Sequence, residues 1–187
     1  MIDYNTKGGP IMKKPGTYDK NGSLVCELIK GNIENNRNLS SFFPNKELFL
    51  KDQDKITEIL IPKGITYIGG SVFRHYPSLV SVTIPDSVRT IGFCAFYDRT
   101  SLTTIHIPNS VEKIKNGAFY HCNSLMTINL PDNLEELDDY VFSECTSLST
   151  ITYKGTVYTS KSALIAELQK NKVIVGVDVF HNTNLQP

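Results

Sequence analysis

The sequence has no excess of charge of either sign. Lys and Arg together number 19, Asp and Glu together number 19, and the formal net charge is +0 at pH 7. Proteins that bind nucleic acids or anionic membranes usually gather a basic excess on one face. The composition therefore predicts no nucleic-acid partner, and it argues against long-range electrostatic capture of any other partner.

Long apolar runs are also missing. No stretch approaches the roughly 20 apolar residues that a membrane-spanning helix needs, so we expect no membrane insertion. Residues 1–10 lack the apolar segment of a signal peptide. The compartment stays open at this stage.

Cysteine is scarce and follows no metal or redox motif. The four cysteines are Cys26, Cys94, Cys122 and Cys145. They form no Cys-x-x-Cys pair or zinc spacing, and they are too few for a disulfide scaffold in a chain of this length. Phosphate-binding loops, nucleophile elbows and His-Glu-x-x-His motifs are equally missing. The sequence thus predicts no catalytic residues, no metal site and no cofactor.

What the sequence does contain is a repeat. Leucines at 79, 102, 125 and 148, phenylalanines at 73, 96, 119 and 142, and prolines at 62, 85, 108 and 131 each recur every 23 residues (102 − 79). A fixed period of this length is typical of stacked repeats, in which each unit closes the core of its neighbour. The chain is therefore expected to be a solenoid that is stable only as a whole.

Each unit begins with the period-2 pattern of a half-buried strand. The two inward-facing residues of each strand are expected to be Ile59/Ile61, Val82/Ile84, Ile105/Ile107 and Ile128/Leu130. Ile151 and Tyr153 extend the pattern into a fifth strand. The proline that follows ends each strand. The Val-Phe or Ala-Phe pair, such as Ala118-Phe119, is expected on a short helical or 3₁₀ turn opposite. We predict an α/β repeat fold with parallel strands on one face.

The ends are expected to differ from the repeats. Residues 1–31 are predicted to be a mobile segment, 32–55 an N-terminal cap or decayed repeat, 56–153 four full units plus a fifth strand, and 154–187 a C-terminal cap. In that cap, Leu164, Ile165 and Leu168 lie at helical spacing behind the Thr159-Ser160 hydroxyls, which predicts a capped amphipathic helix over 161–170. Residues 173–180 are predicted to form a closing strand.

The run from Leu102 to Leu125 resembles the BspA-like (Treponema-type) leucine-rich repeat family, whose usual form is Leu-x-x-Ile-x-Ile-Pro-x-Ser-Val-x-x-Ile-Gly-x-x-Ala-Phe-x-x-Cys-x-x-Leu. The family cysteine is kept at Cys122 and Cys145, while Lys115 and Asp138 replace the family glycine. The resemblance implies a right-handed solenoid. It also implies adhesion or protein binding, often on the surface of bacteria or parasitic protists, and it implies no catalytic residue.

The outward positions of the strands form the candidate binding face. Two ladders are expected, about 4.8 Å from strand to strand: Glu58, Ser81, Thr104, Thr127 and Thr150, and beside them Leu60, Thr83, His106, Asn129 and Thr152. One interpretation is a rigid, polar recognition surface. The other is a solvated sheet face, where Thr and Ser simply suit a strand.

Three other groups have two interpretations each. His121 beside Cys122 could serve a metal or a nucleophile, but adjacent turn residues normally point apart. Cys122 and Cys145 could form a disulfide, although ladder side chains run parallel, which favours buried thiols. The acidic group Glu135, Glu136, Asp138, Asp139 and Glu144 could do acid–base chemistry or bind calcium, or be a solvated edge. The non-functional interpretation is favoured for all three: turn residues that point apart, buried thiols and a solvated acidic edge.

The sequence as a whole favours a monomeric, non-catalytic binding module for a protein or glycan, acting through the strand face and the loops beside Asp86, Asn109 and Asp132. The alternative is a structural or spacer element of a larger surface assembly.

Overall fold

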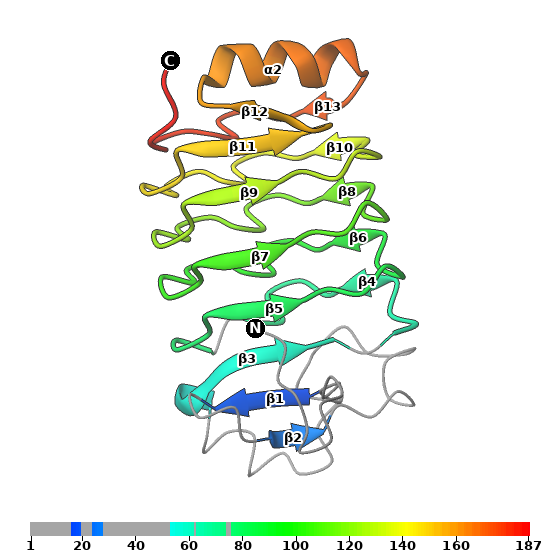
Figure 1. Cartoon of the computed structure of the whole chain (residues 1–187), viewed down its shortest axis with the longest axis vertical. Coiled ribbons are helices and arrows are strands. Elements are labelled where there is room, and N and C mark those ends of the chain that lie inside the picture. Colours follow the sequence, from blue (N-terminus) through cyan, green and yellow to red (C-terminus); the bar gives the residue numbers. More distant parts are fainter. Residues whose placement is uncertain (1–15, 20–23, 28–52, 62, 74–75) are drawn as a thin grey trace, which may run out of the picture.

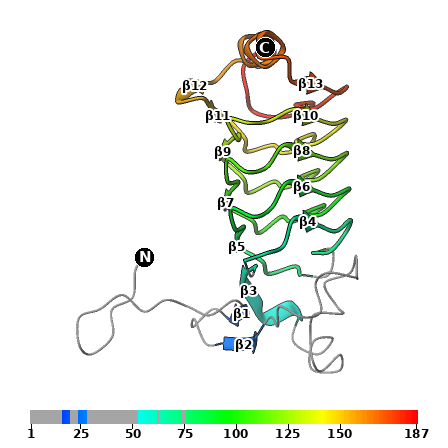
Figure 2. The same ribbon diagram turned by 90° about the vertical axis from the view of Figure 1, so that its right-hand side faces the viewer.

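The structure, a computed structural model, describes residues 16–19, 24–27, 53–61, 63–73 and 76–187. Its body is a solenoid of stacked turns with one sheet on each of two opposite sides (Figures 1 and 2). The expected parallel-strand solenoid with a 23-residue period is confirmed. Expectations for residues 1–15 and 32–52 lie outside the described residues.

The first sheet carries the predicted strands. In chain order these are β3 (Ile56–Leu60), β5 (Ser81–Thr83), β7 (Thr104–His106), β9 (Thr127–Asn129) and β11 (Thr150–Tyr153). Its ladders fall into two parts, β3-β5-β7 and β9-β11, and β9 lies beside β7 in both views. Buried apolar residues of these strands alternate with outward residues, which are polar except for Leu60 of β3.

The second sheet was not predicted. It consists of the two-residue parallel strands β4 (Tyr67–Ile68), β6 (Thr90–Ile91), β8 (Lys113–Ile114), β10 (Glu136–Leu137) and β13 (Ile174–Val175). Each of the first four places one apolar residue in the core, in the column Ile68, Ile91, Ile114 and Leu137. The solenoid core is therefore enclosed between two narrow sheets.

The short helical or 3₁₀ turns expected opposite the first sheet are present only as single turns, and none of them continues as a helix in the described repeats. The Ala-Phe pairs lie in successive turns, in which the Tyr97 N–H donates to the Cys94 carbonyl at 3.1 Å. The Phe96 N–H donates instead to Ala118 of the next unit at 2.8 Å. A backbone N–H that bonds to the neighbouring turn is not available for a helix.

Left-handed residues also interrupt these turns. One column with positive φ contains Cys94, Gly117 and Tyr140, and a second contains Asp98, His121 and Glu144. A helix cannot continue through such positions.

A stack of phenylalanine rings fills the core from end to end. Phe73, Phe96, Phe119 and Phe142 follow one another at centroid distances of 4.7, 5.0 and 5.3 Å, with interplanar angles of 16°, 5° and 11°. All four side chains are fully buried. Offset-stacked rings at this spacing attract one another beyond the gain from burial, so this column joins each unit to the next.

Eight residues of the segment 1–31 form two short strands. β1 (Gly16–Asp19) and β2 (Leu24–Glu27) form a hairpin, and β1 pairs antiparallel with β3. Strand β3 would otherwise leave its outer backbone groups unpaired at the first turn of the solenoid, and pairing satisfies them.

The C-terminal cap contains the predicted helix, α2 (Lys161–Lys170), and an unpredicted strand, β12 (Thr156–Tyr158). Ser160 is the N-cap, accepting a hydrogen bond from the Ala163 N–H at 3.4 Å, and Leu164 and Leu168 are fully buried. The closing strand predicted over 173–180 is only two residues long, β13, because turns follow it up to Phe180.

Candidate interaction surface

The ten predicted face residues all lie on the outer side of the first sheet. The ladder register pairs Glu58 with Ser81 and Ser81 with Thr104, and it pairs Thr150 with Thr127. The second ladder pairs Leu60 with Thr83, Thr83 with His106, and Asn129 with Thr152. The geometry expected of the two ladders is thus present, in two parts that meet between β7 and β9 (Figure 1).

Exposure along this strand face is greatest in the middle turns. Thr83, Thr104, His106, Thr127 and Asn129 are exposed, whereas the residues on β3 and β11 are half-buried. The exposed groups are hydroxyls, an amide and an imidazole, all of which can form hydrogen bonds. Because Val82, Ile105 and Ile128 hold the strands from below, the surface is rigid and polar.

Val157 also belongs to this surface, although its place there was not predicted from the sequence. β11 and β12 form an antiparallel hairpin in which Thr152 pairs with Val157, so both side chains lie on the same side of the sheet. Val157 is 61% exposed. The sequence signal for this hairpin was the pair Lys154-Gly155 between the two strands. Both residues have positive φ (48° and 74°), as a two-residue type I′ turn requires.

The loops that follow the strands are tied to one another rather than open. The Asn109 side chain donates to the Asp132 carboxylate at 3.3 Å and accepts from the Asp132 N–H at 3.0 Å. In earlier turns, the Ser87 hydroxyl accepts from the Gly64 N–H at 3.0 Å, and the Ser110 hydroxyl donates to the Val88 carbonyl at 2.7 Å. Both serines therefore bond to the backbone of the neighbouring turn.

His121 and Cys122 point apart, as expected. The His121 Nδ1 lies 2.7 Å from Asp98 Oδ1 at the surface, whereas the buried Cys122 thiol donates to the Phe96 carbonyl at 3.2 Å. Burial raises the pKa of the Cys122 thiol well above its usual value, and its contact with Cys145 adds to that shift. Cys122 and Cys145 are both buried free thiols, so the expectation for this pair is also confirmed.

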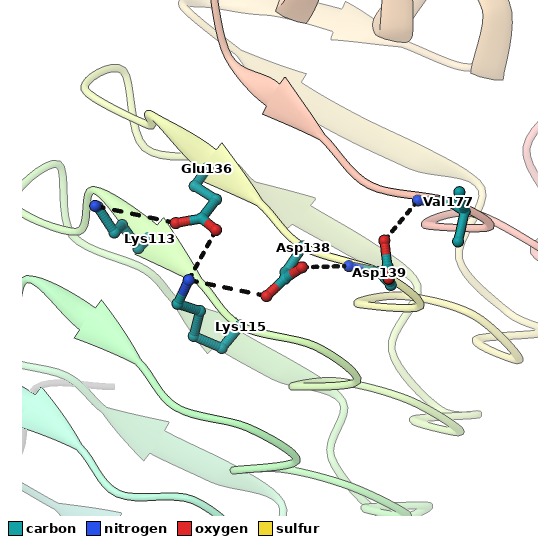
Figure 3. A network of polar contacts seen from close by, with 6 residues as sticks. All are labelled: Lys113, Lys115, Glu136, Asp138, Asp139 and Val177. Carbon is teal, nitrogen blue, oxygen red and sulfur yellow. Dashed lines mark hydrogen bonds and ion pairs between the residues drawn. The ribbon is translucent and has the colours of Figure 1, made fainter.

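The acidic group is more than a solvated edge, because lysines of the preceding unit bind part of it (Figure 3). Lys115 Nζ lies 2.7 Å from Glu136 Oε1 and 3.8 Å from Asp138 Oδ2, and Lys113 Nζ lies 4.0 Å from Glu136. The hydrogen bond to Glu136 raises the pKa of Lys115. Asp139 accepts from the Val177 N–H at 2.8 Å, which ties the cap to the last unit.

The part of the chain that the structure describes has neither a candidate metal-binding group nor a membrane-spanning helix. Those residues contain no group of three or more His, Cys, Asp or Glu side chains that could hold a metal ion. No helix among the described residues is both long and apolar enough to cross a membrane.

Comparison with protein-family models identifies the family to which the repeat belongs. The model of the BspA type leucine-rich repeat region matches residues 45–171 with six copies. The chain belongs to the BspA-type leucine-rich repeat family. The matched region extends beyond the expected 56–153 in both directions, and it includes β12 and α2 of the C-terminal cap.

Solved structures of similar proteins come from several bacteria. A leucine-rich repeat protein from Bacteroides capillosus is 29% identical over 52% of this chain and 77% of its own length, with a TM-score of 0.48. A leucine-rich cell surface protein from Faecalibacterium prausnitzii is 31% identical over 52% of this chain and 38% of its own length (TM-score 0.40).

The T. pallidum leucine-rich repeat protein is 21% identical over 71% of this chain and 82% of its own length (TM-score 0.40). No curated protein matches the chain. Leucine-rich repeat proteins generally serve as scaffolds for protein interactions, which is the functional class of this chain.

Proposed function

We propose that this BspA-type repeat chain is a non-catalytic binding module that recognises a protein or glycan through its strand face. The supporting observation is the row of exposed, uncharged polar side chains on β5, β7 and β9. Those side chains stand on fully packed strands and do not contribute to the core. A fold whose stability comes from its interior leaves such a face free to vary for recognition.

The chemistry of the face limits what it can bind. Binding there depends on hydrogen bonds and close fit rather than on charge attraction, since no Lys, Arg, Asp or Glu stands on β5, β7 or β9. The partner surface is therefore polar and largely uncharged. We place the chain at the cell surface or outside the cell, a proposal that the F. prausnitzii protein supports through its description as a cell surface protein.

The test is capture of a partner by the wild-type chain and by a face variant carrying Thr83→Arg, His106→Glu and Thr127→Arg. A control variant carries the same three charges on the exposed side of α2, as Ala163→Arg, Ala166→Glu and Gln169→Arg. All three proteins must have the same midpoint of thermal unfolding. We expect the wild type and the α2 variant to bind one identified partner with equal affinity, and the face variant to lose it.

The second candidate is a structural or spacer element, which the capped ends of the solenoid favour. Hairpin β1-β2 extends one end of the first sheet, and β12 with α2 covers the other (Figure 1). A spacer needs no partner on the strand face. If the face variant retains every partner that the wild type captures, the strand-face proposal is wrong and the binding site lies elsewhere on the chain; if neither protein captures a partner, the spacer function is supported.

A further inference from the structure

The second sheet presents an outer surface on the side opposite the strand face (Figure 2). Its outward ladder has the register Tyr67, Thr90, Lys113, Glu136 and Ile174, from β4 to β13. Beside this ladder, Lys115 and Asp138 stand two residues further along their units, and Phe93, Asn116, Asp139 and Val177 stand three residues further along theirs. We call this ladder and these neighbouring positions together the back face.

Large apolar side chains stand exposed toward both ends of the back face. Phe93 follows β6 and is 56% exposed, and Ile174 and Val177 at β13 are 68% and 59% exposed. An isolated exposed apolar residue is ordinary at a protein surface, but clusters rimmed by polar groups mark interaction sites. Here the apolar positions are separated by two turns with charged side chains.

The charges in those two turns are sorted by sign. Lys113 and Lys115 belong to the unit of β8, and Glu136 and Asp138 belong to the unit of β10 (Figure 3). From β6 to β13 the back face therefore reads apolar, basic, acidic, apolar. When a second copy is laid against the first in the opposite direction, each basic turn meets an acidic turn and each apolar turn meets an apolar turn. The pattern is therefore complementary to itself.

From this pattern we propose that the back face binds a second copy of the chain, with the two solenoid axes antiparallel. The two-fold axis runs along the strand direction between β8 and β10. Lys113 and Lys115 of each copy then face Glu136 and Asp138 of the other, while Phe93 faces Val177 and Ile174. A symmetric dimer uses the same patch on both copies, and it forms only where that patch complements itself.

Groups at the margin of the face limit its affinity. Glu112 and Glu135 occupy equivalent positions and would face each other across the dimer, although Arg89 lies 3.7 Å from Glu112 and offsets that charge.

The area of the back face also limits the affinity of the dimer. Five strands about 4.8 Å apart and about six residues of width give a buried area of roughly 400 Å² for each copy. The total, about 800 Å², is below the roughly 1,200 Å² of stable interfaces. We therefore expect a weak dimer, in place of the monomer expected from the sequence.

Pairing through the back face leaves both strand faces free and directed away from each other. If the strand face binds as proposed above, the dimer is bivalent, and a clustered partner is held more tightly than a single copy could hold it. Self-association does not depend on that function, because it is measured on the purified chain alone.

The experiment is sedimentation velocity of the full chain from micromolar to millimolar concentration, with Phe93→Lys and Val177→Asp variants. Each variant places a charge against an apolar group in its own dimer, and we expect its dissociation constant to rise at least ten-fold. In an equimolar mixture, the lysine introduced by Phe93→Lys in one copy faces the aspartate introduced by Val177→Asp in the other, while the remaining Phe93–Val177 contact is native. We expect the mixture to recover to within about three-fold of wild type.

Each variant must retain the wild-type thermal melt, which the exposure of both side chains favours. Val157→Lys, at the exposed edge of the strand face, serves as the matched control and should leave self-association unchanged. A wild type that stays monomeric at millimolar concentration would overturn the proposal. So would single variants that associate like wild type, or a mixture no tighter than the variants alone.

Discussion

The ring of Phe180 stacks on the ring of Phe142, with centroids 5.9 Å apart and planes 4° apart. The two residues are 38 positions apart (180 − 142), whereas the other neighbours in this column are 23 apart (142 − 119). The difference is an insertion of 15 residues (38 − 23) between β11 and β13, which holds β12 and most of α2. The C-terminal cap is therefore a further repeat that carries an inserted helix.

Backbone hydrogen bonds support this description of the cap. The Gly176 N–H donates to the Leu137 carbonyl at 2.8 Å, as the Asp138 N–H donates to Ile114 one turn earlier at 3.0 Å. The Phe142 N–H donates to Val179 at 2.9 Å, as Phe119 does to Val141 at 2.9 Å. The family period thus continues in space where the spacing in the sequence breaks.

Replacing Phe119 by Ala should lower the free energy of unfolding by about 3–5 kcal/mol. Phe119 is fully buried and stacks on Phe96 and Phe142, so truncation leaves a cavity in the middle of the ring column. Chemical denaturation measures the change. Phe93→Ala, at an exposed ring, should change the same quantity by less than about 0.5 kcal/mol; equal losses for both variants would show that the ring column is not the core.

Gly117→Ala should destabilise the chain by about 1–2 kcal/mol, the cost of a left-handed conformation for a residue with a Cβ. Gly117 has φ +61°, and an added Cβ would lie 3.3 Å from the Cys94 sulfur. Urea denaturation gives the cost. Adding Cys94→Ala should recover only a small part of it, because the backbone strain remains; full recovery would mean that the sulfur contact, not the backbone, sets the cost.

Lys172→Gly should stabilise the chain by roughly 0.5–1 kcal/mol. Lys172 follows α2 with φ 61°, and its N–H donates to Gln169 at 2.8 Å while the Val173 N–H donates to Leu168 at 3.0 Å. This is the helix-ending arrangement in which glycine is the preferred residue. A raised midpoint in a thermal melt is the expected result, and Lys170→Gly, inside the helix, should lower it.

The stability of the chain should fall with rising pH above about 8.5, the ordinary pKa of an unfolded thiol. Burial raises the folded pKa of Cys122 above that value, so the folded state keeps its proton while the unfolded state loses it. The contribution is complete below about pH 8.5 and decreases by up to about 1.4 kcal/mol for each pH unit above it. Urea titrations from about pH 7.5 to about pH 10 bracket that pKa and measure the slope.

Cys122→Ala removes this thiol, and its stability should depend less on pH than that of wild type over the same range. An unchanged slope in the variant would contradict the assignment to Cys122. Alkylation gives a second measurement, since a buried thiol of raised pKa should react only as fast as the chain opens.

Regular spacing made the first sheet and the core predictable. Ile105 and Leu102 could be assigned to the interior because the same residue type recurs at the same place in each unit. The helix behind Ser160 could be predicted because its N-cap and apolar face are local signals. The second sheet could not be, since a strand of two residues such as Lys113–Ile114 shows no alternation.

The candidate surfaces divide in the same way. The residues of the strand face follow from the repeat, so Thr83 and His106 could be named from the sequence, and the ladder places them side by side. Val157 could not be, because it reaches that face through a hairpin outside the repeat. The ion pair between Lys115 and Glu136 was missed because the two residues are 21 positions apart and meet only across stacked turns.

The amino-acid sequence by itself determined the period, the buried columns and the outward ladders, because burial follows from apolar residues that recur at fixed intervals. The tertiary structure alone decided how the turns close. Hydrogen bonds from Phe96 and Phe119 to the next unit kept the segments opposite the first sheet as single turns, and Phe180 continued the ring stack despite the inserted residues. Contacts between neighbouring turns depend on where stacking brings them, and spacing along the chain does not reveal that position.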